Sequence, residues 1–241
     1  MRLVICLPTY NERANLEPLV RRLGDLFAER DLDARVLVID DSSPDGTGEI
    51  ADRLSDELPF LSVLHRSRKE GLGPAYIAGF RWALENGADL ILQMDADFSH
   101  DPADVPTLLA ATESADLALG SRYVEGGGTE NWGRGRQRIS RFGSFYARAI
   151  LGVSVRDLTG GFKCWRREAL AALPLDRVRT KGYAFQIETT YRALVAGFRV
   201  AEVPIVFAER RSGGSKMTRG IVLEAMTKVP ELRLRAALRR L

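Results

Sequence analysis

The chain has little cysteine and no long hydrophobic stretch. Only Cys6 and Cys164 occur among its 241 residues, a count that favours buried reduced thiols over a disulfide framework or a cysteine metal site. Its apolar runs are far shorter than the ~20 residues of a membrane-spanning helix, and Pro8 interrupts the first run before it could form a signal-peptide core. We therefore expect a cytoplasmic chain without a spanning segment.

A large excess of charge is also missing. The net charge is +3, and a hydrophobic content of 45% is close to the globular average, which excludes a disordered or fibrous chain and favours one folded domain. Basic residues nevertheless cluster in two segments, which contain Arg134, Arg136, Arg138 and Arg141, and Arg233, Arg235, Arg239 and Arg240. Such clusters suit nucleic acid, anionic lipid or a single phosphate, and a solvated surface explains them equally well.

Short apolar runs alternate with segments of helical period. We expect strands at Leu3–Leu7, Arg35–Ile39, Leu61–His65, Leu90–Met94, Leu117–Gly120 and Arg199–Val206, and helices near 15–27, 48–58, 74–85 and 185–196. This alternation predicts an α/β fold with a mostly parallel central sheet and helices on both faces.

Regularity ends after Tyr123. The stretch from Glu125 to Arg138 is rich in Gly and Arg without a clear period, which predicts a mobile loop that is functional or disordered. A helix-like segment, Ser140–Leu151, follows it. Apolar residues interleave with Arg138, Arg141 and Arg148 here, namely Trp132, Ile139, Phe142, Phe145, Tyr146, Ile150 and Leu151. They suit a helix in a membrane interface, although packing on the domain explains them equally well. The C-terminal run Leu232–Leu241 either lies in a membrane interface in the same way or is part of a longer protein.

Polar motifs follow the expected strands, at the sheet edge where α/β proteins bind ligands. The first strand ends in Pro8-Thr9-Tyr10-Asn11-Glu12 and lacks the Gly-x-Gly-x-x-Gly of a dinucleotide site. Tyr10 and Glu12 could line a nucleobase pocket, or Asn11 could lead a helix-capping turn.

The second strand ends in Asp40 and Asp41, which we interpret as ribose or base ligands, whereas Ser43, Asp45 and Gly46 have turn and cap chemistry. After the third strand, the basic, glycine-containing turn 66–76 precedes a helix, a suitable place for a phosphate.

Asp95 and Asp97 leave the fourth strand together. Mg²⁺ and Mn²⁺ favour one or two carboxylates plus substrate phosphate oxygens, so the pair suggests a metal-diphosphate site. Asp-x-Asp alone arises often by chance, and the neighbouring motifs make it informative.

These motifs together are specific. They are Pro8–Glu12, Asp40–Thr47, Gly71–Tyr76, Asp95–Pro102, Gly120–Tyr123, Asp157–Lys163, Lys181–Glu188 and Glu202–Ile205. In this order they resemble the family-2 glycosyltransferases of the GT-A fold, and within them the polyprenol (dolichol) phosphate mannose synthases. The resemblance implies a catalytic domain over residues 1–220, with an acceptor loop at about 124–140, and a C-terminal amphipathic helical tail over 221–241.

The resemblance also implies an activity, the inverting transfer of mannose from GDP-mannose to the phosphate of a polyprenyl phosphate, with Mg²⁺ or Mn²⁺. By this analogy the nucleotide-sugar site contains Pro8, Tyr10, Glu12, Asp40, Asp41, Gly71, Asp95, Ala96, Asp97, Arg210 and Lys216. The metal ligands are Asp95, Asp97 and Ser99, the last at a position where some relatives have Gln. Arg122, Arg136 and Ser140 match the acceptor-phosphate residues, so that the catalytic set is Asp97, Arg122, Arg136, Ser140, Arg210 and Lys216.

No general base is needed for this chemistry, because a phosphate monoester is largely dianionic at neutral pH and can attack the sugar directly. We interpret Glu188 and Asp157 as orienting or structural residues.

Three alternatives remain: the same reaction with UDP-glucose, a nucleotide- or RNA-binding module without catalysis, and an inactive regulatory GT-A domain. The first would leave every named role intact, and the second would not need Asp95 and Asp97. Our prediction is the transferase, without a nucleic-acid partner, peripheral on the cytoplasmic face of a membrane or held there by an anchoring partner.

Overall fold

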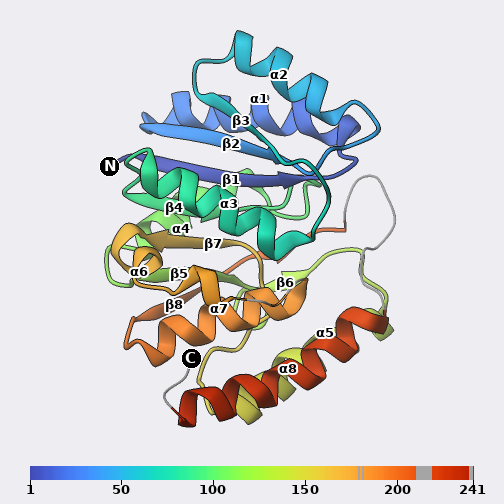
Figure 1. Ribbon diagram of the computed structural model, residues 1–241, viewed down its shortest axis with the longest axis vertical. Helices are drawn as coiled ribbons and strands as arrows, with labels where there is room; N and C mark the ends of the chain where they lie inside the picture. Colours follow the sequence, from blue (N-terminus) through green and yellow to red (C-terminus); the bar gives the residue numbers. More distant parts are fainter. Residues whose placement is uncertain (179, 181, 210–218, 239–240) are drawn as a thin grey trace.

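A seven-stranded sheet runs through the middle of the molecule in the computed structural model, which describes residues 1–178, 180, 182–209, 219–238 and 241 (Figure 1). Its strands are β1 (Leu3–Thr9), β2 (Ala34–Asp40), β3 (Leu61–His65), β4 (Leu90–Gln93), β5 (Leu117–Ser121), β7 (Lys163–Arg166) and β8 (Val200–Pro204), in the order β3-β2-β1-β4-β7-β5-β8. Within the described chain, β7 is antiparallel to β4 and β5, and the other neighbouring pairs are parallel.

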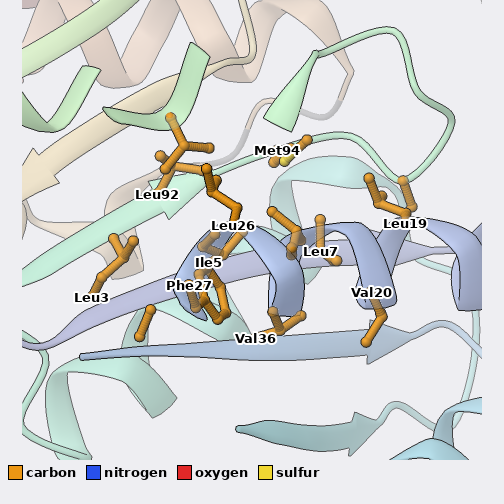
Figure 2. Close-up of a cluster of buried hydrophobic side chains, with 14 of the residues drawn as sticks. Leu3, Ile5, Leu7, Leu19, Val20, Leu26, Phe27, Val36, Leu92 and Met94 are labelled. Atoms are coloured by element: carbon orange, nitrogen blue, oxygen red, sulfur yellow. The ribbon is translucent and has the colours of Figure 1, made fainter. Parts of the chain in front are cut away.

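Helices cover both faces of this sheet, as the alternation of the sequence predicts. Along β1, Leu3, Ile5 and Leu7 point to one face and Val4 and Cys6 to the other, because successive strand side chains alternate. The first face carries α1 (Arg13–Arg30), α2 (Thr47–Glu57), η1 (Pro102–Asp104) and α4 (Val105–Ala111). Apolar side chains of α1, α2 and α4 join one core cluster, and Figure 2 shows the part of it between α1 and the strands. The second carries α3 (Leu72–Glu85), α6 (Arg167–Ala171), η2 (Leu175–Arg177) and α7 (Tyr183–Val195). The predicted α/β class is thus confirmed.

Two further helices lie side by side beyond β8, the outermost strand on that side of the sheet (Figure 1). These are α5 (Arg134–Leu151) and α8 (Arg219–Ala237), which share a third apolar cluster with α7. Ala147 and Leu151 of α5 and Val229 and Leu232 of α8 are buried in it. None of the described helices combines the length and apolar composition needed to cross a bilayer.

The stretch predicted to be a structureless loop is shorter than expected. A short strand, β6 (Gly128–Thr129), pairs with β9 (Val206–Phe207), and α5 begins at Arg134 rather than at Ser140. Apolar periodicity does not reveal the first residues of this helix, because Arg134 and Gly135 are exposed and carry no apolar side chain. Arg is nevertheless a good helix former.

Strand β7 was not predicted either. It has four residues, of which Lys163 is a buried cation, so its composition gives no strand-like apolar run. Burial decides between the two alternatives for Trp132, which precedes α5, and for Leu151 at its end. Their exposed fractions are 8% and 1%, so both pack on the protein and do not face a membrane.

Candidate active site

The parallel strands β1, β2 and β4 deliver their end motifs to one edge of the sheet. At each end the chain reverses through a non-glycine residue with a left-handed backbone: φ is 58° at Asn11, 53° at Ser42 and 62° at Phe98. Such conformations are uncommon outside glycine and gather at functional sites. This edge therefore has the tight reversals that a ligand-binding surface needs.

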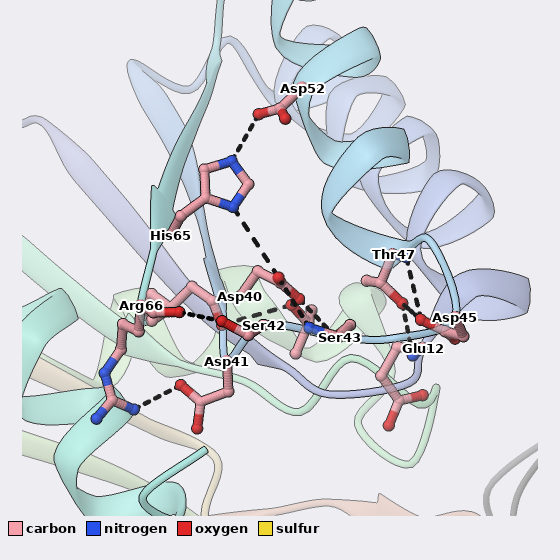
Figure 3. Close-up of polar contacts among 12 residues, drawn as sticks. Glu12, Asp40, Asp41, Ser42, Ser43, Asp45, Thr47, Asp52, His65 and Arg66 are labelled. Carbon is pink, nitrogen blue, oxygen red and sulfur yellow. Dashed lines mark hydrogen bonds and ion pairs between the residues drawn. The ribbon is translucent and has the colours of Figure 1, made fainter. Parts of the chain in front are cut away.

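Asp40 and Asp41 lie on this edge with their carboxylates already engaged (Figure 3). Asp40 accepts hydrogen bonds from the backbone N–H of Ser43 at 3.2 Å and from its hydroxyl at 2.5 Å. Arg66 Nη1 donates to Asp41 Oδ1 at 2.5 Å. Burial raises the pKa of Asp41, and Arg66 opposes that rise only in part. Ser43, which we predicted to be a turn residue, thus orients the Asp40 carboxylate through these two hydrogen bonds.

Glu12 and Tyr10 come from the end of β1. The Glu12 side chain is buried, where its carboxylate accepts from Asn15 Nδ2 at 2.8 Å. The ammonium of Lys69 lies 3.6 Å from the centre of the Tyr10 ring. Lys69 belongs to the predicted basic turn, so this turn folds over the end of β1 as a phosphate-binding turn would. Gly71 ends it with φ 109°, a value that favours glycine.

Two more residues predicted for the nucleotide site also fall on this edge. Pro8 is in β1, and Ala96 is buried between the two aspartates of the predicted metal site. Arg210 and Lys216 lie outside the described residues.

The acidic pair follows β4. Asp97 is buried and its Oδ1 accepts from the backbone N–H of Ser99 at 3.1 Å and from its hydroxyl at 2.5 Å. The Asp95 backbone N–H donates to His100 Nδ1 at 3.1 Å. Burial lowers the pKa of His100, which matches an acceptor nitrogen on a neutral ring. Ser99 and His100 thus orient the two aspartates, and metal ligation by Ser99 stays a prediction.

The chemistry of this pair fits a hard divalent cation that also binds substrate oxygens. Both side chains offer carboxylate oxygen at the end of one strand, and no group of three His, Cys, Asp or Glu side chains that could hold a metal forms among the described residues. Mg²⁺ commonly takes one or two carboxylates plus phosphate oxygens.

Arg122 follows β5 and is almost fully buried with Asp157. Its Nε and Nη2 donate to the two carboxylate oxygens, each at 2.7 Å, and Nη2 also donates to the Thr159 hydroxyl at 2.8 Å. Burial by itself would raise the pKa of Asp157, but the Arg122 guanidinium outweighs it and lowers that pKa. The arrangement holds a buried ion pair, with an oriented guanidinium, at the end of β5.

Helix α5 brings the other two predicted acceptor residues to the same place. Tyr123 donates its hydroxyl hydrogen to Ser140 Oγ at 2.7 Å, and Ser144, one turn further along, donates to Asp157 at 3.5 Å. Arg136 Nη1 donates to Glu209 at 3.0 Å. The structure thus brings Arg122, Arg136 and Ser140 together, although they come from two separate elements.

An aromatic side chain lies between His100, the neighbour of the acidic pair, and these cations. The Phe207 ring of β9 has its centre 5.3 Å from that of His100 and 5.4 Å from that of Trp132. Arg122 Cζ is 5.4 Å from the Phe207 ring centre. The acidic and the basic halves of the site are therefore neighbours across one ring.

Sequence reasoning missed three members of this site. His100 was detectable as a histidine placed directly after the acidic pair. Phe207 carries no sequence signal, and for Trp132 the sequence left open a membrane interface or packing on the domain.

Comparison with known proteins agrees with this geometry. The pattern of glycosyl transferase family 2 matches residues 4–173. An undecaprenyl-phosphate mannosyltransferase of Micrococcus luteus is 49% identical over 229 residues, which cover 95% of this chain and 93% of that protein. A polyprenol monophosphomannose synthase of Mycolicibacterium smegmatis is 46% identical, with 99% and 89% covered.

Solved structures show the same fold at low identity. Mannosyl-3-phosphoglycerate synthase from Rubrobacter xylanophilus superposes with a TM-score of 0.70 at 16% identity, over 100% of this chain and 76% of that one. Glucosyl-3-phosphoglycerate synthase from Mycobacterium tuberculosis, in complex with Mn²⁺, uridine diphosphate and phosphoglyceric acid, gives 0.64 at 20% identity, over 99% and 78%. The fold is therefore GT-A, and the chain belongs to glycosyltransferase family 2.

Proposed function

We propose that this protein transfers mannose from GDP-mannose to the phosphate of a polyprenyl phosphate. The observation that carries the proposal is a chain of contacts through the Phe207 ring. On one side lies His100, which binds the backbone N–H of Asp95 in the carboxylate pair suited to a metal diphosphate. On the other side lies Arg122, and Trp132 connects the same ring to Arg136, so that two arginines suited to a second phosphate are close by. The two curated relatives, by their names, act on polyprenyl phosphates and transfer mannose, and they align over nearly the whole chain.

On the donor side, Asp95 and Asp97 would hold Mg²⁺ or Mn²⁺ together with the diphosphate, and Asp40 and Glu12 would bind the nucleoside. A bound divalent cation neutralises charge on the leaving diphosphate. The chain's own contribution is orientation, because Ser99 fixes the Asp97 carboxylate and His100 fixes the backbone at Asp95. Arg210 and Lys216 are proposed to close over the diphosphate.

On the acceptor side, Arg122 and Arg136 would bind the phosphate monoester and Ser140 would donate a hydrogen bond to it. Guanidinium groups suit phosphate because their planar N–H groups form paired hydrogen bonds. The dianionic oxygen can attack the sugar carbon without a base, in line with the departing diphosphate, so positioning is the main task of the protein. Asp157 holds Arg122 ready for it.

Contact with the lipid is proposed to occur through α5. Ile139, Phe142 and Phe145 are exposed on this helix, with exposed fractions of 57%, 62% and 57%. Beside them lies a cavity of about 410 Å³ lined by Tyr123, Arg141, Phe145, Arg148 and Arg156. Apolar side chains next to arginines suit the boundary between acyl chains and anionic headgroups. Tyr123 links this cavity to Ser140.

The cytoplasmic face of the membrane is the proposed location. Cys6 and Cys164 are both free and buried, which is compatible with a reducing compartment.

The decisive experiment supplies the purified protein with radiolabelled GDP-mannose or UDP-glucose, Mg²⁺ or Mn²⁺, and either a polyprenyl phosphate or the corresponding alcohol. We expect labelled lipid only with GDP-mannose, metal and the phosphate. Labelling from UDP-glucose alone would assign the other donor, and no labelling under any condition, in a protein that binds the nucleotide, would refute the transferase proposal.

A further inference from the structure

Two buried N–H groups beside the acceptor arginines have no hydrogen-bond partner within the described chain. They are the indole Nε1 of Trp132 and the guanidinium Nε of Arg136. Trp132 is 8% exposed, and its ring centre is 3.9 Å from Arg136 Cζ and 5.7 Å from Arg122 Cζ. The indole is therefore a neighbour of both guanidinium groups.

Unsatisfied buried donors of this kind are rare in folded proteins, where about nine in ten buried polar groups find a partner. Indole and guanidinium nitrogens can donate hydrogen bonds but cannot accept them. Whatever satisfies them must therefore supply acceptor atoms. The nearby guanidinium groups each pair with one carboxylate, Arg122 with Asp157 and Arg136 with Glu209. Guanidinium groups favour an anion with several oxygens over a neutral acceptor.

The surroundings hold the indole in place before any ligand arrives. The Phe207 ring meets it edge to face, with ring centres 5.4 Å apart, and Phe207 is itself held by the pairing of β6 with β9. The Arg136 guanidinium lies over the Trp132 ring, an attractive arrangement between a cation and an aromatic face. A donor that is already oriented binds its acceptor at a lower entropic cost.

Arg136 already pairs with an oxyanion of the protein itself. The Glu209 carboxylate takes a hydrogen bond from Arg136 Nη1 at 3.0 Å. The Arg136 side chain is one-quarter exposed but its Nε is buried, so a phosphate would meet the exposed part of the guanidinium, in place of Glu209 or beside it, and would reach Nε as the side chain moves.

From these contacts we infer that Trp132 binds the acceptor phosphate, its indole N–H donating to a phosphate oxygen beside Arg136 Nε. This inference rests on the proposed function and adds to it a residue that selects for the phosphate monoester. The indole is a neutral third donor beside the two arginines, and it adds a hydrogen bond without adding charge.

The test compares Trp132→Phe with Trp82→Phe. The first keeps an aromatic ring and loses the N–H, and the second changes a half-buried tryptophan of α3 that is outside the site. We expect Trp132→Phe to raise the KM for polyprenyl phosphate about tenfold or more, as loss of a hydrogen bond to a charged group does, with an unchanged KM for GDP-mannose. Trp82→Phe should change neither constant.

A direct readout uses the wild-type protein and needs the variant only to assign one signal. The chain has three tryptophans, so ¹⁵N-tryptophan labelling gives three indole N–H signals, and the one missing from Trp132→Phe belongs to Trp132. We expect that signal to move downfield when a water-soluble isoprenyl phosphate is added, and not when the isoprenol is added. Inorganic phosphate should move it in the same direction at higher concentration, which would show that the phosphate group itself is recognised.

The outcomes separate the two proposals. If wild-type protein makes no lipid-linked mannose, the proposed function fails. If it does, but isoprenyl phosphate binds without moving the Trp132 signal, or the isoprenol moves it equally, the role of Trp132 is refuted and the proposed function stands.

Discussion

The buried ion pair between Arg122 and Asp157 makes a strong prediction for Asp157→Asn. Asp157 is completely buried, and its carboxylate accepts hydrogen bonds from the backbone N–H, Nε and Nη2 of Arg122. The substitution preserves shape and removes the charge, so that it leaves a buried guanidinium opposite a neutral amide. Removing one partner of such a pair costs about 3–5 kcal/mol of unfolding free energy.

A matched control is available on the surface. Asp176 pairs with Arg81, and both side chains are more than half exposed. Exposed pairs of this kind contribute about 0–1 kcal/mol, so Asp176→Asn should be almost neutral. Urea unfolding measures both variants, as a shift of the midpoint at constant slope.

The pH dependence gives an independent check. Because the pKa of Asp157 is lowered in the folded state, its ionised form adds stability that is fully present above the ordinary carboxyl pKa of about 4 and is lost as the pH falls through the lowered value. The difference between wild type and Asp157→Asn should therefore be constant near neutral pH and shrink in acid. Equal midpoints for Asp157→Asn and Asp176→Asn, or a difference that grows in acid, would refute this reasoning.

Four further predictions concern the site and the core. Asp97→Ala should lower metal-dependent transfer about a hundredfold or more, and it should cost only about 1–3 kcal/mol of unfolding free energy for the buried Ser99 donors that lose their acceptor, so the protein stays folded; full activity would remove the metal assignment. Arg136→Ala should raise the acceptor KM about tenfold with donor binding intact, and equal losses of both would contradict its placement. Gly79→Ala puts a Cβ 2.5 Å from Ile39 Cδ1 and should destabilise the protein by about 1–3 kcal/mol. In Gly143→Ala the new Cβ meets open space in a helix, so this control should be stabilising. Equal Tm changes would argue against the close packing of Gly79 on Ile39. Phe142→Ser should weaken binding to anionic vesicles, and unchanged flotation would argue against α5 as the membrane face.

The strands and their ends were predictable because their signals are local. Apolar runs such as Leu90–Gln93 coincide with buried strands, and the polar residues that follow them must gather at one edge once the strands are parallel. The acidic pair was recognisable for the same reason. Strand β7 was not, since its buried Lys163 is stabilised by Gln186, a partner 23 residues away that no local pattern reveals.

The start of α5 and the burial of Trp132 show a second limit of prediction from sequence. Periodicity detects a helix only where one side packs on the protein, and the first turn of α5 is exposed. Trp132 looked like part of the same apolar stripe as Phe142, yet one is buried and the other is 62% exposed. A tryptophan next to arginines has the same composition in a membrane interface and in a cation-lined site, and only its neighbours distinguish the two.

By itself, therefore, the sequence determined the α/β class, the order of the strands along the chain and the chemistry at their ends, because these follow from residue periodicity and from charge at strand termini. Only the tertiary structure decided which charges pair and which rings meet. Asp157 reaches Arg122 across 35 residues, and Phe207 separates His100 from Trp132 only after β9 has paired with β6. Such contacts depend on how whole helices and strands pack. Each side chain could find many alternative partners along the chain, but only one packing arrangement provides partners for all of them at once.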